Sequence, residues 1–250
     1  MWSVNPFTNL TVFLSPLVMQ IYIVLMILAV AIGTIYDLLH GSKTKFFTRQ
    51  RRKSRAYAKR EISGGEAAGI AAKTLVTNVA TSGEFHSRER RISHLLMLYG
   101  FVIYLLTTIA MIFLYVRGST PLAVPVLWNL GALMLLAGGY WFFFFLRVNV
   151  SHDGHSRFSL VRADLFVFSL LASVTFALIM EAVETAQSTA ATAVLFSFYI
   201  FFTTILFVSV PWSKFSHMFY KPGVAIQKKI EEASGSSDLP SPADGPHGGA

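Results

Sequence analysis

Five long apolar segments constrain this chain more than any other feature of its sequence. Each can cross a hydrocarbon core of about 30 Å, which takes about 20 helical residues. Because lipid cannot satisfy backbone polar groups, each segment must be a helix, and the alternation typical of barrel strands is absent. The sequence therefore predicts an all-α fold, an integral membrane bundle of five transmembrane helices. The segments are residues 16–36, 95–116, 121–146, 165–180 with an extension to about 183, and 189–210.

Composition supports this fold and limits the chemistry. Of the 250 residues, 54% are hydrophobic and 14% are charged, whereas soluble domains have about 25% charged residues. The chain has no cysteine, so it forms no disulfide, ligates no iron–sulfur cluster and attaches no haem covalently. The common nucleotide-binding, zinc-protease and serine-hydrolase motifs are also absent. We expect a non-catalytic subunit, in which any redox centre is held by histidine or belongs to a partner.

The distribution of lysine and arginine predicts the orientation. Thirteen of these residues fall in the segment 40–92 and none in residues 1–15. The connections at residues 117–120, 147–162 and 184–188 carry one, three and no basic residues, and four more basic residues follow residue 211. With five spans and the positive-inside rule, the N-terminus faces outside and the C-terminus is cytoplasmic. Twenty of the 21 basic residues then lie inside, and Arg117 alone lies outside.

The predicted organisation has four parts, which are residues 1–40 (N-terminal segment and first helix), 41–92 (basic cytoplasmic loop), 93–222 (the other four helices) and 223–250 (polar cytoplasmic tail). The dense charge of residues 42–60 is typical of a topology anchor that also contacts anionic membrane lipid. Residues 64–81 indicate a short helix that lies on the membrane surface or against a partner. No nucleic-acid-binding motif accompanies the charges, so nucleic acid is not expected as a partner. The Gly, Pro and Ser content of the tail favours disorder.

Two of the seven histidines form the main candidate site. His94 opens the second helix at its cytoplasmic end, and His217 lies at the cytoplasmic end of the fifth. Two histidines at one depth on different helices can ligate one haem iron. The alternative is that both lie in the interface and bond to headgroups or backbone. The other histidines are weaker candidates, and they are His40, His86, His152, His155 and His247.

Ionisable residues near the helix ends allow further interpretations. Lys214 can pair with an anionic group such as a haem propionate. Glu181 and Glu184 lie near the outer end of the fourth helix. They mark the water boundary there or, alternatively, make a contact with a proton or a quinol.

Two motifs carry a resemblance to a known family. Residues 210–222 read VPWSKFSHMFYKP and residues 90–100 read RRISHLLMLYG. They resemble the landmarks of the respiratory nitrate reductase gamma-subunit-like family, the membrane subunits of quinone-interacting oxidoreductases. The resemblance covers roughly residues 15–222. It implies one haem b near the cytoplasm, with His94 and His217 as iron ligands and Arg91 and Lys214 as further haem contacts.

A second, deeper histidine pair of that family falls on or near Tyr104 and Tyr199 of this chain. Neither residue is histidine, so the resemblance implies that the outer haem is absent. The quinone site is then expected in the inner half of the bilayer, near the second and fifth helices.

The layout most resembles the stand-alone membrane anchors associated with adenylylsulfate reductase. This resemblance implies a multi-pass protein of the bacterial inner membrane, in sulfur metabolism. It would hold soluble flavin and iron–sulfur subunits on its cytoplasmic face and pass electrons between them and quinone. The alternatives are a haem-free docking subunit and a small transporter.

Overall fold

The computed structural model describes residues 3–40, 48–49, 51–52, 54, 56–77, 81, 87–146, 164–184, 189–210 and 217–236. These residues form helices and no strand. Five of the helices are long and apolar enough to cross a membrane, which confirms the predicted all-α bundle of five spans. The spans are Pro16–Asp37, Arg88–Phe113, Ala123–Leu146, Leu165–Val183 and Thr189–Ser209.

The second span begins seven residues before the predicted start at residue 95. Its helix, α4 (Arg88–Phe113), includes Arg88, Arg90 and Arg91, all of which are exposed. An apolar run ends at the first charged residue, whereas the helix itself can continue through basic residues whose side chains extend toward water. The basic residues therefore belong to the first two turns of a helix that then enters the apolar span.

The chain divides into two compact units. The bundle unit comprises Met1–Thr34 and Phe85–Phe215, and the helical-pair unit comprises Ile35–Glu84 and Ser216–Ala250. The helical-pair unit thus combines the basic loop with the C-terminal segment, which lie far apart in the sequence.

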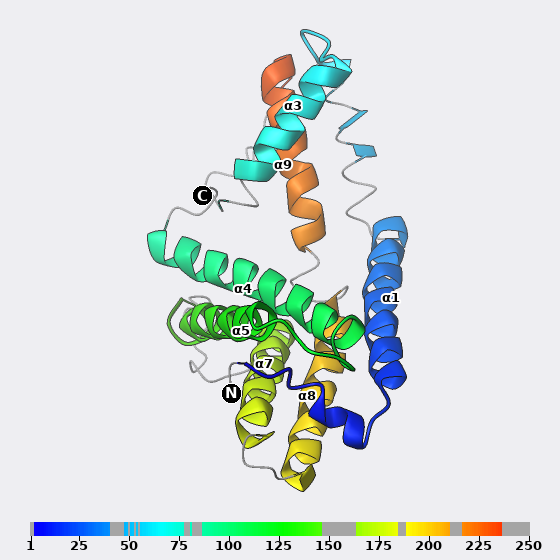
Figure 1. The fold of residues 1–250 in the computed structure, drawn as a ribbon. Helices are drawn as coiled ribbons and strands as arrows, with labels where there is room; N and C mark the ends of the chain where they lie inside the picture. Colours follow the sequence, from blue (N-terminus) through cyan, green and yellow to red (C-terminus); the bar gives the residue numbers. More distant parts are fainter. Residues whose placement is uncertain are drawn as a thin grey trace. The chain divides into compact units, whose positions relative to one another are not determined.

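In the bundle unit the helices pack as neighbouring pairs. Helix α4 lies along α5 (Ala123–Trp141), which continues into the π-helical η3 (Phe142–Leu146). Helix α7 (Leu165–Glu184) lies along α8 (Thr189–Ser209), and α5 also contacts α7. These pairs can be followed in Figure 1.

Glycines allow α4 and α5 to approach closely. A Cβ placed on Gly100 of α4 would lie 2.6 Å from the backbone nitrogen of Leu135, and one on Gly131 of α5 would lie 2.7 Å from that of Tyr104. Close backbone approach at small residues is a common source of van der Waals packing between membrane helices. The hydroxyl of Ser93 donates to the carbonyl of Gly138 at 2.8 Å and joins the same two helices.

The N-terminal segment before α1 (Pro16–His40) belongs to the bundle unit and includes the short 3-10 helix η1 (Asn9–Val12). The side chain of Asn5 donates to the carbonyl of Met111 at 3.1 Å, near the end of α4. Phe7 is 1% exposed and meets the ring of Trp128 edge to face. The segment is therefore anchored to the end of the bundle by hydrogen bonds of Asn5 and aromatic contacts of Phe7.

Hydrogen bonds connect α1 to the rest of the bundle. Gln20 donates to the carbonyl of Ile112 on α4 at 3.2 Å. The hydroxyl of Tyr22 lies 2.9 Å from that of Thr204 on α8. Most of the remaining surface of α1 is apolar and exposed, as expected for a helix that faces lipid.

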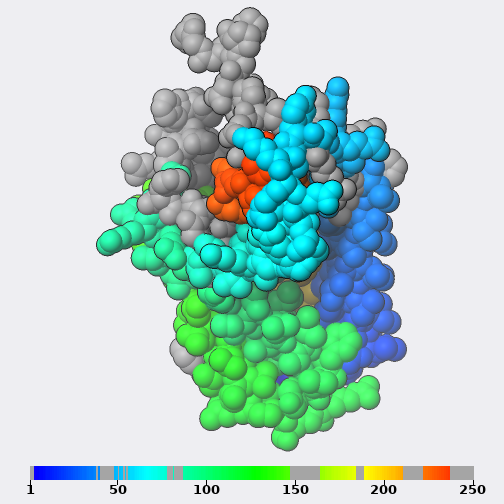
Figure 2. All heavy atoms as spheres, turned by 90° about the horizontal axis from the view of Figure 1, so that it is seen from above, coloured from blue at the N-terminus to red at the C-terminus, as the bar shows by residue number. Residues whose placement is uncertain are grey.

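The helical-pair unit is built on α3 (Gly64–Leu75) and α9 (His217–Ser234). The two helices pack side by side, as Figures 1 and 2 show in cyan and orange. Helix α3 confirms the short helix expected within residues 64–81, and the Ser63 side chain caps it by accepting from the nitrogen of Glu66.

Helix α9 corrects the expectation of disorder after Pro222. The helix includes Pro222 near its start and continues to Ser234, across the predicted boundary at residue 223. Composition indicated disorder because Gly, Pro and Ser dominate the end of the tail. Residues 223–234 instead place Ile226 and Ile230 one turn apart, both half-buried, in a strongly amphipathic helix packed on α3.

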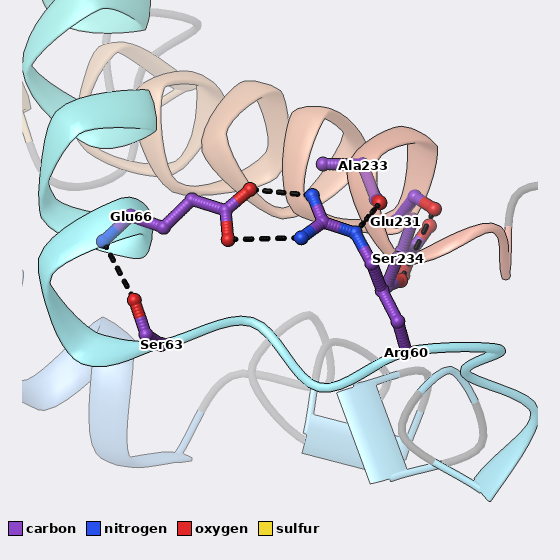
Figure 3. Close-up of polar contacts among 6 residues, drawn as sticks. All are labelled: Arg60, Ser63, Glu66, Glu231, Ala233 and Ser234. Carbon is purple, nitrogen blue, oxygen red and sulfur yellow. Dashed lines mark hydrogen bonds and ion pairs between the residues drawn. The ribbon is translucent and has the colours of Figure 1, made fainter.

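Arg60 ties the two helices of this unit together (Figure 3). Its Nη1 atom donates to Oε2 of Glu66 on α3 at 3.2 Å, and its Nε atom donates to the carbonyl of Ala233 on α9 at 3.0 Å. Gly235 follows α9 with φ of 71°, and the nitrogen of Ser236 donates back to the carbonyl of Glu231 at 3.0 Å. This is the usual glycine-terminated helix end, which only a residue without Cβ adopts at low cost.

Candidate functional site

A cavity of about 240 Å³ lies within the bundle unit. Its walls come from the N-terminal segment and four spans, α1, α4, α7 and α8. Its lining includes Phe7, Tyr22, Tyr104, Val174, Tyr199 and Thr203. Tyr199 and Val174 lie near the middle of their helices, so the cavity is at the depth of the membrane interior rather than at an end of the bundle.

Most hydroxyl groups in the cavity walls already bond to protein. The Tyr22 hydroxyl bonds to Thr204, and Thr203 donates to the carbonyl of Tyr199 at 2.6 Å. The hydroxyl groups of Ser173 and Thr203 lie 2.7 Å apart and connect α7 with α8. These groups are satisfied internally, so the cavity presents mainly hydrocarbon and aromatic surface to a ligand.

The hydroxyl of Tyr104 differs from these bonded groups. The residue is 7% exposed, and its hydroxyl is buried without a hydrogen-bond partner. Tyr199, also 7% exposed, is near enough to interact with it electrostatically. Leaving a buried hydroxyl unsatisfied costs about 1–3 kcal/mol. A buried, unpaired donor beside an apolar cavity is the polar feature that distinguishes this site.

An aromatic group fixes the position of the Tyr104 ring. The ring centroids of Tyr104 and Trp128 lie 5.2 Å apart, and Trp128 is fully buried. The indole nitrogen of Trp128 donates to the hydroxyl of Thr108 at 2.9 Å. Tyr104 therefore lies between a fixed indole ring and the cavity wall that it shares with Tyr199.

Glu181 and Asn129 form a second buried polar feature. Glu181 is 3% exposed, and its Oε1 atom accepts from Nδ2 of Asn129 at 3.1 Å. Its Oε2 atom is buried without a partner. Glu181 lies in the last turn of its span, which fits the predicted position near the outer end of the fourth helix, but it is buried between helices rather than exposed at a water boundary.

His94 lies in α4, less than two turns after its start at Arg88. Its side chain is half-buried and takes part in an interaction within the protein. Arg91 is exposed one turn earlier in the same helix and also makes an interaction. Both predicted site residues are therefore at the basic end of α4.

His217 is the first residue of α9 and belongs to the helical-pair unit, whereas His94 belongs to the bundle unit. The side chain of His217 and the whole of Lys214 lie outside the described residues. The pairing of His94 with His217 on one haem iron therefore stays a prediction. His86, His152, His155 and His247 also lie outside the described residues, as does the side chain of His40.

Within the described ranges, no group of three or more His, Cys, Asp and Glu side chains gathers as metal ligands. A haem needs less from the protein, because the macrocycle itself supplies four nitrogen ligands and the chain supplies one or two axial ones. The imidazoles of His94 and His217 are of the residue type that can serve as such axial ligands.

Comparison of the chain with protein-family models, with curated proteins and with solved structures gives no match. The resemblance drawn from the two histidine motifs therefore stays a prediction. The five apolar helices define the class, a multi-pass helical membrane protein.

The sequence did not reveal the cavity or the Glu181–Asn129 pair. Tyrosine and asparagine inside long apolar runs are the available signals, because buried polar groups in a membrane usually have a partner or a function. Tyr104 and Tyr199 were singled out only as positions that lack histidine, and no periodicity argument places them beside one cavity.

Proposed function

We propose that this chain is the membrane anchor subunit of an oxidoreductase complex of sulfur metabolism, similar to the anchor of adenylylsulfate reductase. It holds soluble flavin and iron–sulfur subunits at the cytoplasmic face of the bacterial inner membrane. Electrons pass through it between those subunits and the quinone pool. The chain itself carries out no bond-making chemistry.

The observation that supports docking best is the helical-pair unit. Two segments separated by the four later spans fold together as α3 and α9, and neither helix is among the candidate spans. A membrane protein that needed only a topology anchor would not need a folded module from both of its basic segments. Concentrated positive charge also attracts an acidic partner and makes the association sensitive to salt.

The electron carrier in this proposal is one haem b, held by His94 and His217. The haem would supply a one-electron centre between the iron–sulfur partner and quinone. The position of His94 among the basic first turns of α4 supports a location near the cytoplasmic face. Arg91 and Lys214 would neutralise propionate charge there.

Affinity purification from native membranes tests the proposal, with two C-terminal truncations as a matched pair. Removal of residues 223–250 deletes most of α9, whereas removal of residues 237–250 leaves α9 and its terminating Gly235 in place. We expect flavin and iron–sulfur subunits to elute with the intact chain and the shorter truncation at low salt, and to be lost from the longer one.

Both truncated proteins should remain in the membrane fraction, because the five spans are unchanged. Absence of soluble oxidoreductase subunits from the intact preparation, or equal retention by all three proteins at low and high salt, would contradict the proposal.

A further inference from the structure

The intramembrane cavity combines three properties that together select a ligand. It is apolar, it lies at the depth of the bilayer interior, and Tyr104 in its wall has an unused hydroxyl. Its volume of about 240 Å³ exceeds that of an engineered apolar cavity of about 150 Å³ that binds benzene in another protein. A substituted six-membered ring is therefore within its capacity.

Depth distinguishes among the molecules that a membrane offers. A phospholipid keeps its ester and headgroup oxygens at the interface, so only its acyl chain reaches the middle of α8, and an acyl chain has no acceptor for a tyrosine hydroxyl. A prenylated quinone is apolar enough to enter the bilayer interior and carries two carbonyl acceptors on a flat ring. Aromatic side chains suit such a ring, and Phe7, Tyr104 and Tyr199 all line the cavity.

We infer that this cavity binds the ring of a membrane quinone, with a ring carbonyl entering beside Tyr104 and Tyr199 and accepting a hydrogen bond from Tyr104. Binding then satisfies a hydroxyl that is enclosed and unpaired in the free protein. The site thus lies at the middle of the spans, whereas the sequence predicted it in the inner half of the bilayer, near the second and fifth helices. The inference rests on the proposed function for its use in electron transfer, whereas binding itself can be measured on this chain alone.

Trp128 provides a built-in reporter, because its ring centroid lies 5.2 Å from that of Tyr104. The chain has four tryptophans, so Trp2, Trp141 and Trp212 are replaced by phenylalanine to leave Trp128 alone. Decylubiquinone is titrated into this protein in phosphatidylcholine nanodiscs while fluorescence is recorded. Quinone bound at the site quenches the fluorescence of Trp128 saturably, whereas collisional quenching rises linearly with quinone concentration. The nanodisc lipid keeps acyl chains in large excess throughout the titration.

Tyr104→Phe removes the hydroxyl and keeps the ring. We expect the dissociation constant for decylubiquinone to rise about fivefold, because one neutral hydrogen bond to the quinone is lost. The matched control is Tyr22→Phe in the same cavity, whose hydroxyl already bonds to Thr204, and its dissociation constant should change less than about twofold on the same reasoning. Because the Tyr104 hydroxyl makes no bond in the free protein, its loss should not lower the unfolding temperature.

A second variant, Ile23→Phe, adds volume to the cavity from α1, where Ile23 is half-buried, and leaves both tyrosines unchanged. Saturable quenching should be lost in this variant. Unchanged quenching in both Tyr104→Phe and Ile23→Phe would overturn the inference. The proposed function would stand in that case, because quinone could still be reduced elsewhere on the protein. Purely linear quenching in the Trp128-only protein would overturn the inference as well, and electron transfer from the partner complex to quinone would then test the proposed function separately.

Discussion

Tyr104 of α4 and Tyr199 of α8 line the same intramembrane cavity, and each is 7% exposed. The family resemblance expects a deeper histidine pair on or near these two positions. The two residues are 95 positions apart in the sequence, yet they line one cavity in the folded chain. A site built from two helices needs such an arrangement. With tyrosine at both positions, this part of the cavity wall carries two phenol rings.

The first prediction follows from the unequal hydrogen bonding of the cavity tyrosines. Tyr22→Phe should lower the free energy of unfolding by about 0.5–1.5 kcal/mol, because its hydroxyl bonds to Thr204. Tyr104→Phe should leave the free energy of unfolding unchanged or raise it, because an unpaired buried hydroxyl is removed. Unfolding by SDS in mixed micelles measures both. A larger loss in Tyr104→Phe than in Tyr22→Phe would show that the Tyr104 hydroxyl is in fact bonded.

Packing between α4 and α5 gives the second prediction. Gly100→Ala places a methyl group 2.6 Å from the backbone nitrogen of Leu135, so the helices must separate, at a cost of about 1–3 kcal/mol. Gly69→Ala is the matched control, because this helical glycine has no neighbour within 4 Å of an added Cβ. The same unfolding assay should give a gain of up to about 1 kcal/mol for the control. Equal effects of the two substitutions would rule out close packing at Gly100.

Hydropathy predicted the membrane helices well and the polar contacts poorly. Apolar length determines where a chain can cross lipid, and the predicted limits 121–146 and 189–210 differ by no more than two residues from those in the structure. The start of α4 was missed because a helix can continue through basic residues. Helix α9 was missed because the tail was read by composition, whereas its fold depends on a partner helix, α3, that is remote in sequence.

For the candidate site too, the sequence identified single residues but not the contacts between helices. His94 was identified by residue type, and it lies within the first two turns of α4, beside Arg88, Arg90 and Arg91. The cavity needs the relative rotation of α1, α4, α7 and α8, and a single helix pattern carries no information about that rotation. Asn129 could not be assigned to Glu181 for the same reason, since their helices meet only in the folded bundle.

That buried pair gives the third prediction. Asn129→Leu leaves the Glu181 carboxyl without its donor, and the free energy of unfolding should fall by about 1–3 kcal/mol. Adding Glu181→Leu to this variant removes the stranded group and should recover much of the loss. A double-mutant cycle measured at one pH gives the coupling between the two residues. Additive effects would show that Asn129 does not stabilise Glu181.

Orientation is the fourth prediction, and the absence of cysteine makes it easy to measure. Single cysteines are introduced as Ser3→Cys, before the first span, and as Gly64→Cys, at the exposed start of α3. The positive-inside rule predicts that a membrane-impermeant maleimide labels the first in intact cells and the second only after permeabilisation. Labelling of Gly64→Cys in intact cells would reverse the topology and remove the docking face from the cytoplasm.

Electron transfer through one haem held by His94 and His217 is the core of the proposed function, and the number of haems per chain is its decisive measurement. The protein is purified from haem-replete cells and quantified by its pyridine haemochrome and its reduced-minus-oxidised spectrum. We expect one b-type haem per chain, lost in His94→Ala and in His217→Ala and retained in the control His247→Ala. Two haems per chain, or a colourless protein that still binds its soluble subunits, would refute single-haem electron transfer by this chain.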